Sequence, residues 1–141
     1  MANIVPDSFK NELFLSIHNF SSTAGNTFKL ALYSTSTGFS AASTTAYTTT
    51  NEVSGTGYTA TGASLTNLGS TVAQNISFVD FSDVTFSTAT ITASAALIYN
   101  TTNSGKAVVV LDFGGNKTST NGDFTIQFPA ANSTSAIIRI S

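Results

Sequence analysis

Short stretches with apolar side chains at every second position, separated by turn residues, recur along this chain of 141 residues. In residues 28–33, FKLALY, the alternating positions are held by Phe28, Leu30 and Leu32. A period of two places such side chains on one face of an extended strand, so this stretch predicts a half-buried β-strand. Residues 76–81, ISFVDF, predict a second one.

A longer pair of stretches predicts a β-hairpin. Residues 91–99 and 106–113 flank the turn sequence Asn103-Ser104-Gly105. The second stretch contains the apolar run VVVLDF, which is short enough for a central strand covered on both faces. Residues 114–122 are rich in Gly, Asn, Ser and Thr and are expected to form a loop.

Weaker strands complete the pattern. They are expected around residues 60–66, at 84–86 after a kink at Asp83, at 123–128 before Pro129, and at 136–140. Seven or eight short strands with turns between them predict an all-β fold. We expect an antiparallel β-sandwich or jelly-roll-like barrel over residues 27–140, in a single domain spanning residues 1–141.

The N-terminal segment has a different period. Phe9, Leu13 and Ile17 are spaced four apart, which predicts one short α-helix over residues 8–18, preceded by an extended arm over residues 1–7. Asp7 or Ser8 is expected to cap the helix. His18, the single histidine, is then expected at the negative end of the helix dipole or on the surface.

Residues 55–60, GTGYTA, match the glycine fingerprint of dinucleotide-binding folds. That fingerprint requires a preceding apolar strand and a following helix whose N-terminus faces the pyrophosphate. Neither is expected here, so the segment is interpreted as a shaped loop. Gly55, Gly57 and Gly62 would set its backbone, and Tyr58 would anchor it.

Side chains suited to catalysis or metal binding are scarce. The chain has no cysteine and one histidine, so it lacks the ligands of a zinc site and, without G-x-S-x-G, the elements of a serine triad. Asp80 with Asp83, and Asp112 with Asp123, are the candidates for a glycosidase pair or a calcium site. Their spacing fits Asx turns better, so we expect neither an enzyme nor a bound cofactor or metal.

The composition favours an interaction protein. Charged residues make up 9% of the chain, against about 25% in an average domain, whereas Ser and Thr make up about a third. Five scattered cations form no basic patch, so no nucleic-acid partner is expected. No apolar run approaches the ~20 residues needed to span a membrane, and no membrane association is expected.

A carbohydrate-binding module would have a similar composition, with Tyr33, Tyr47, Tyr58 and Tyr99 as the rings on which sugars stack.

Several segments carry a family likeness: MANIVPDSFKNEL, FKLALYSTS, TTNEVSGTGYTATG, ALIYN and VVVLDFGGNKTSTNGDFTIQFP. Together they resemble small virion structural proteins of tailed bacteriophages, notably marine podovirus-like ones, over nearly the whole chain. The resemblance implies a capsid decoration (cement) protein that is made in the host cytoplasm and sits on the capsid surface. Its partners would be the major capsid protein and further copies of itself, as a dimer or trimer. No catalytic motif is carried over.

Contacts with such partners are expected from the arm, in particular Val5 and Phe9, and from the Ser/Thr loops at residues 35–50 and 114–122. The alternative is a tail or fibre component that contacts the host surface and has carbohydrate affinity. Location on the particle distinguishes the two roles.

Overall fold

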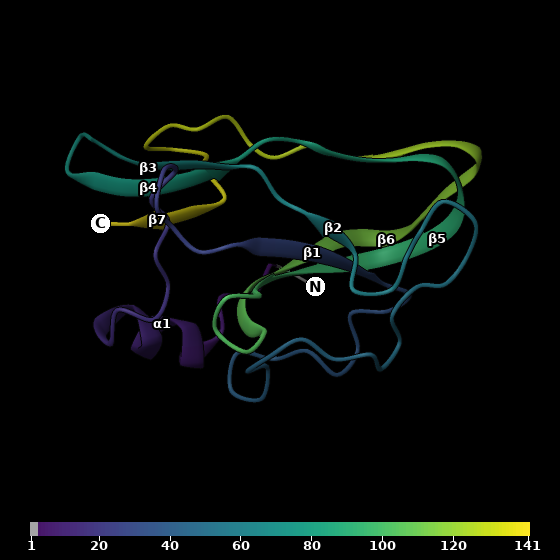
Figure 1. Ribbon diagram of the computed structural model, residues 1–141, viewed down its shortest axis with the longest axis horizontal. Coiled ribbons are helices and arrows are strands. Elements are labelled where there is room, and N and C mark those ends of the chain that lie inside the picture. The colour runs from purple at the N-terminus through teal and green to yellow at the C-terminus, as the bar shows by residue number, and fades with distance from the viewer. Residues whose placement is uncertain (1–2) are drawn as a thin grey trace.

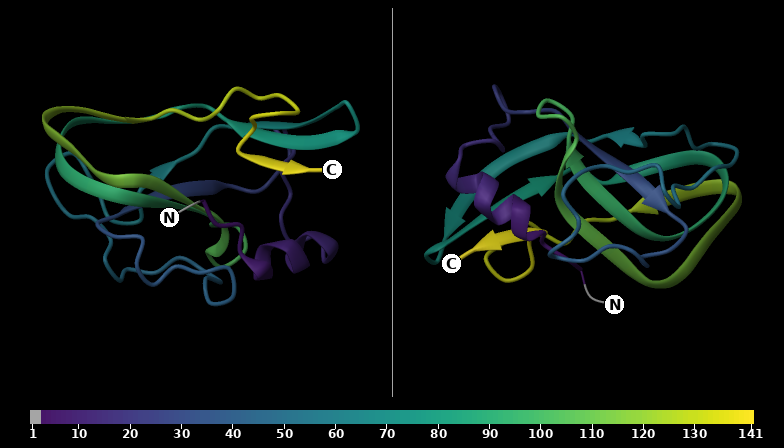
Figure 2. Two further views of the ribbon diagram at one scale, coloured as in Figure 1. Left: turned by 180° about the vertical axis from the view of Figure 1, so that it is seen from behind. Right: turned by 90° about the horizontal axis from the view of Figure 1, so that it is seen from below.

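The computed structural model describes residues 3–141 and has an all-β fold of two antiparallel sheets with one short N-terminal helix, as the sequence predicts (Figure 1). The elements, in chain order, are α1 (Asp7–Phe14), β1 (Phe28–Tyr33), β2 (Ala63–Ser64), β3 (Asn67–Ala73), β4 (Ile76–Phe81), β5 (Val84–Asn100), β6 (Lys106–Ile126) and β7 (Ile138–Ile140). One sheet has the order β2-β1-β5-β6 and the other the order β3-β4-β7. Strands β5 and β6 form a long ribbon that curls around one end of the molecule (Figures 1 and 2).

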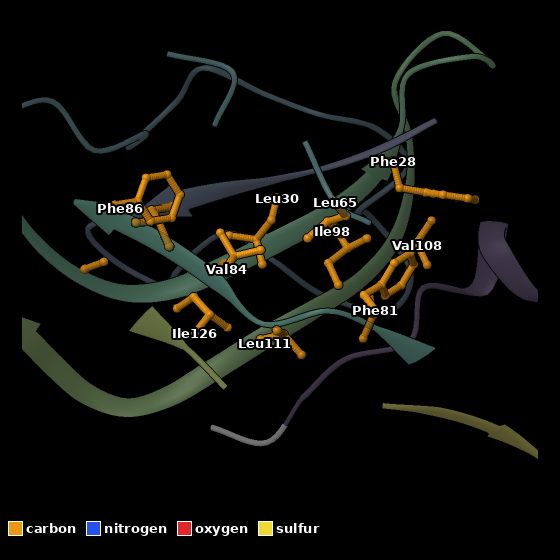
Figure 3. Close-up of a cluster of buried hydrophobic side chains, with 14 of the residues drawn as sticks. Phe28, Leu30, Leu65, Phe81, Val84, Phe86, Ile98, Val108, Leu111 and Ile126 are labelled. Carbon is orange, nitrogen blue, oxygen red and sulfur yellow. The ribbon is translucent and has the colours of Figure 1, made fainter. Parts of the chain in front are cut away.

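The main core lies between the two layers. Alternation along β1 turns Phe28, Leu30 and Leu32 inward, where they meet Phe81 of β4 and Ile138 of β7. Figure 3 shows the labelled part of this cluster: Phe28, Leu30, Leu65, Phe81, Val84, Phe86, Ile98, Val108, Leu111 and Ile126. Because the β5–β6 ribbon curls, its two ends contribute to the core from opposite sides.

The other face of the four-stranded sheet is covered too. Ala31, Tyr33, Leu97 and Val110 belong to a second buried cluster, on the face opposite the main core. The covering residues are Ile4, Phe39 and Tyr47, which come from the N-terminal segment and the loop between β1 and β2. This double coverage explains why residues 108–111, VVVL, are apolar throughout.

The apolar run nevertheless lies in an edge strand, not in the central strand that was predicted. β6 is last in its sheet, and its outer edge is paired only locally. Ile4 and Val110 exchange backbone hydrogen bonds of 2.9 and 2.8 Å, and Ala107 N–H donates to Thr45 O at 3.0 Å. These short bridges protect an edge that would otherwise be open to strand addition.

The structure corrects the sequence prediction at one expected loop and at two strands. Residues 114–122 are part of β6, not a loop, because their Gly and Asn residues create bulges in a continuing ladder. β3 was not predicted, because most of its side chains are exposed and its sequence therefore lacks apolar residues at every second position. The strand expected around residues 60–66 is reduced to the two residues of β2.

The predicted helix and its cap also need correction. α1 ends at Phe14, and Ser16 turns the chain with a φ of 58°, so Ile17 and His18 lie outside the helix. No side chain caps the N-terminus, because Asp7 and Ser8 are already helical and extended Pro6 precedes them. Ser8 Oγ instead donates to Thr44 O at 3.3 Å.

Candidate functional site: an apolar cleft at the open end of the sandwich

An apolar cleft of about 600 Å³ separates α1 from β7. We call it the docking cleft, and its lining consists of Val5, Phe9, Lys10, Leu13, Phe14, Ala136, Ile137, Ile138, Arg139 and Ile140. The structure thus places two sequence-predicted contact residues, Val5 and Phe9, in one site. Phe9 is only 1% exposed, so it contributes to the wall of the cleft rather than to an outer contact surface.

The helix contributes three apolar side chains to the lining of the cleft. Phe9 packs into the main core, and Leu13, one turn later, packs against the same core. Phe14 also lines the cleft, but its side chain is 91% exposed. A phenylalanine that contacts almost nothing in its own fold adds nothing to the core, and clustered exposed apolar side chains mark interaction sites.

The three-stranded sheet extends beyond the core above the helix. Val72, Ser77 and Ile140 are direct partners across β3, β4 and β7, so they share one face. The next row on that face includes Val79 and Ile138, which are buried in the main core. Val72 and Ile140 are 70% and 54% exposed, because no second layer covers this end of the sheet. The sandwich is therefore open where α1 and β7 diverge (Figure 1).

The charged side chains that line the cleft are both cations. Lys10 Nζ lies 2.8 Å from Asp7 Oδ1, in a pair that is exposed on both sides. Arg139 Nη1 donates to Ser133 O at 2.8 Å and forms no ion pair among residues 3–141. The cleft therefore combines an apolar floor with two cations at its rim, of which Lys10 is paired with Asp7 and Arg139 is not in an ion pair within residues 3–141.

β7 is also a free sheet edge. Within residues 3–141 it pairs only with β4, and no loop segment hydrogen-bonds to its other side. An unpaired edge offers backbone donors and acceptors in a row to an extended segment. The docking cleft therefore provides both apolar contacts and backbone pairing.

A buried polar network fixes the helix that forms one wall. Glu12 Oε2 lies 2.7 Å from His18 Nε2, and Glu12 Oε1 accepts from Lys106 Nζ at 2.8 Å. Asn100 Nδ2 donates to His18 Nδ1 at 3.1 Å. Burial alone would raise the pKa of Glu12, but the hydrogen bonds from Lys106 and His18 bring that pKa below its usual value. The expectation that His18 is a surface or helix-capping residue was wrong, because its ring is buried in this network.

The glycine loop lies away from the cleft. Gly55, Gly57 and Gly62 have φ values of 156°, 80° and 80°, and each lets another strand approach closely. A Cβ on Gly62 would lie 1.9 Å from Leu30 O, and one on Gly57 would lie 2.6 Å from Ala89 Cα. Residues 55–60 form a loop with no helix after it, so the context of a dinucleotide site is missing.

Tyr58 belongs to a cluster that contains all four tyrosines of the chain. Its hydroxyl donates to Glu52 Oε1 at 2.7 Å, and the hydroxyl of Tyr47 donates to Glu52 Oε2 at 2.6 Å. Burial, followed by the bond to Glu52, raises the pKa of Tyr47 to about 12 and raises that of Tyr58 as well. Tyr33 and Tyr99 donate to backbone carbonyls of the same loop. Sequence patterns did not show this grouping, because the loop that holds Glu52, Tyr47 and Tyr58 meets Tyr33 of β1 and Tyr99 of β5 only in the fold.

The aspartates bind backbone N–H groups, Asp80 and Asp112 locally and Asp83 and Asp123 across to another segment. Asp80, Asp83, Asp112 and Asp123 each accept a hydrogen bond from a backbone N–H, at 2.7 to 3.2 Å. Within residues 3–141 no group of three or more His, Asp or Glu side chains is arranged to hold a metal ion. That part of the chain also has no helix long and apolar enough to cross a membrane.

Compared with known proteins, the chain matches no family model, no curated protein and no solved structure.

Proposed function

We propose that this chain is a structural protein of a phage virion, a capsid decoration protein that binds the major capsid protein and bridges neighbouring capsomers. The observation that carries the proposal is the docking cleft, with Phe14 exposed at its mouth beside Ile140. The sequence resemblance to small phage virion proteins supports the same role. The chain would act on the outer surface of the capsid, as a dimer or trimer.

Burial of the cleft would drive this binding. Each Å² of apolar surface removed from water contributes about 25 cal/mol, so covering Phe14, Val72 and Ile140 is favourable. The low content of charged residues, 9%, limits the desolvation cost of the surrounding surface. Many copies on one shell would add avidity to modest contacts.

The occupant of the cleft would be an extended segment of the major capsid protein. Its backbone would pair with the free edge of β7, and its apolar side chains would fill the floor between Leu13 and Ile140. A carboxylate on this segment would complement the cations Lys10 and Arg139. An apolar segment that carries a carboxylate therefore fits the docking cleft, whereas a basic or strongly polar segment does not.

Binding to the shell is the direct test. The full chain would be mixed with capsids assembled from the major capsid protein of the encoding phage, separated by sedimentation and imaged by electron cryomicroscopy. We expect co-sedimentation at a fixed stoichiometry and density in which the α1–β7 end faces the shell. Absence of the chain from the shell, or density only at the tail tip, would contradict the proposal.

A tail or fibre component that contacts the host surface is the second candidate. One observation favours it: a hollow lined by hydroxyl groups lies beside the paired rings of Tyr47 and Tyr99. The imaging experiment above separates the two candidates by location.

A further inference from the structure

A second hollow, of about 420 Å³, lies beside the C-terminal end of β5. Its lining consists of Lys29, Tyr47, Thr61, Tyr99, Thr101, Ser104 and Gly105. We propose that this hollow binds an acidic saccharide, a sugar ring that carries a carboxylate. The proposal does not rest on the capsid role, because it uses none of the residues of the docking cleft.

The aromatic part of the site is rigid. The rings of Tyr47 and Tyr99 stack with centroids 4.8 Å apart and an interplanar angle of 27°. Both hydroxyls are engaged by groups of the protein: Tyr47 donates to Glu52, and Tyr99 donates to the carbonyl of Thr61. The half-buried Tyr47 therefore offers its hydrocarbon ring to the hollow in a fixed orientation, as a sugar ring requires for C–H contacts.

Gly105 keeps this ring accessible. It has a φ of 71°, and a Cβ there would lie 3.5 Å from Tyr47 Cβ and 3.8 Å from Tyr99 Cδ2. Any larger side chain would extend across the aromatic pair. The backbone of Gly105 also holds Tyr47 in place, because its carbonyl accepts the Tyr47 N–H at 2.8 Å.

Lys29 supplies the charge that favours an acidic ligand. Its ammonium donates to Thr61 Oγ1, and no ion pair within residues 3–141 includes it. Two of its three N–H donors remain for a ligand. The nearby carboxylate of Glu52 already accepts from two tyrosine hydroxyls and from the Thr61 N–H. A ligand carboxylate would thus meet an available cation, in a charge-assisted hydrogen bond.

Thr61 is held in a strained conformation at the edge of the hollow. Its φ of 79° is unfavourable for a β-branched residue. Three contacts hold it there: Glu52 accepts from its N–H, Tyr99 donates to its carbonyl, and Lys29 donates to its hydroxyl. Strain that is maintained by so many partners is characteristic of binding sites.

The remaining lining groups match sugar hydroxyls. Thr101 and Ser104 are exposed neutral side chains that line the hollow. Thr101 Oγ1 uses its hydrogen on Thr27 O at 2.9 Å, which leaves its lone pairs as acceptors. A small set of polar groups around one aromatic ring is the usual composition of a small-molecule site.

The test is a titration of the ¹⁵N-labelled full chain, followed by NMR chemical shifts. The probes are trigalacturonic acid, a glucuronate disaccharide and N-acetylneuraminic acid, with maltotriose as the neutral control. We expect saturable shifts of the Lys29, Tyr47 and Gly105 amides with at least one acidic probe, and binding at least about tenfold weaker for maltotriose. No shift with any acidic probe, or equal binding of maltotriose, would overturn the proposal.

Variants locate the site. Lys29→Met should weaken binding of the acidic probe at least about tenfold, whereas Lys29→Arg should retain it. Lys117→Met removes a cation elsewhere and should leave binding unchanged. The dispersion of each spectrum reports whether the variant is folded. Retained affinity in a folded Lys29→Met protein would show that the ligand binds elsewhere and would refute the assignment.

Discussion

The Nε2 atom of His18 lies 2.7 Å from Oε2 of Glu12, inside the protein. Because Asn100 donates to the other ring nitrogen, the proton of the neutral ring is on Nε2 and is donated to the carboxylate. Lys106, just after the β5–β6 turn, donates to the second carboxylate oxygen. Through these bonds Glu12 joins α1 to the four-stranded sheet and fixes one wall of the docking cleft.

Acid should weaken this attachment. Although burial opposes ionisation, the bonds from Lys106 and His18 hold the pKa of Glu12 below its usual value. The stabilisation is therefore present above the pKa that Glu has in the unfolded chain, and it is lost as pH falls through the lower folded pKa. Glu12→Gln should reduce the free energy of unfolding by about 1–3 kcal/mol near pH 7.

Urea unfolding at several acidic pH values measures this effect. Glu12→Gln should also show a shallower loss of stability with falling pH than the wild-type protein. Asp7→Asn, which removes an exposed ion pair with Lys10, is the matched control and should cost less than about 1 kcal/mol. Identical acid profiles for Glu12→Gln and the wild type would contradict the role of the carboxylate.

Alkali should unfold the protein through its tyrosines. The neutral phenol is favoured in the fold, with a pKa raised to about 12 for Tyr47 by burial and by its bond to Glu52. The unfolded chain releases these protons near pH 10, so stability is intact below that pH and declines above it. Tyrosinate absorbance and circular dichroism, followed together during alkaline titration, should change in one transition. Ionisation of Tyr47 near pH 10 in a folded protein would show that the prediction is wrong.

Gly57 should tolerate no side chain. Gly57→Ala would place a Cβ 2.6 Å from Ala89 Cα, in addition to the left-handed strain at φ 80°. The strain costs about 1–2 kcal/mol and the overpacking about 1–3 kcal/mol more. Gly114→Ala is the matched control, since its φ is 72° and its Cβ would have no neighbour within 4 Å. Thermal unfolding should show a clearly lower midpoint for Gly57→Ala than for Gly114→Ala, and equal midpoints would refute the close approach.

Phe14 should matter for binding and not for folding. Because its side chain is 91% exposed, Phe14→Ser should change the free energy of unfolding by less than about 0.5 kcal/mol. Its removal should nevertheless abolish or strongly reduce co-sedimentation with capsids. Leu68→Ser removes an exposed apolar side chain outside the cleft, 53% exposed, and should preserve binding. Undiminished binding of Phe14→Ser would exclude the docking cleft as the contact.

Sequence patterns predicted strands best where apolar side chains mark the face that packs into the main core. The strands at residues 28–33 and 76–81 were correct to the residue, because apolar residues alternate along each of them. The expectation that residues 28–33 are half-buried was wrong, because Ala31 and Tyr33 are buried on the other face of β1. Where burial is weak the pattern fails, as in β3. The helix was predicted too long since Ile17 continues the spacing of Phe9 and Leu13, although the chain turns at Ser16.

The sites depend on partners that are distant in the sequence, so they were only partly predicted. Val5 and Phe9 were expected at a contact surface, yet nothing in their neighbourhood indicated β7 as the opposite wall. Similarly, the bond of His18 to Asn100 joins residues 82 positions apart, and His18 reaches Glu12 only because the chain turns at Ser16. A single histidine beside a predicted helix carries no local sign of such burial.

The bridge between Ile4 and Val110 has a consequence for synthesis of the chain. The first described residues pair with a strand that the ribosome adds more than a hundred positions later. Until that strand emerges, the N-terminal segment has no edge to join, and helix α1 has no Lys106 to complete its attachment. Folding of the nascent chain therefore cannot finish before residues 106–110 have emerged, and contacts of such long range make the process slow.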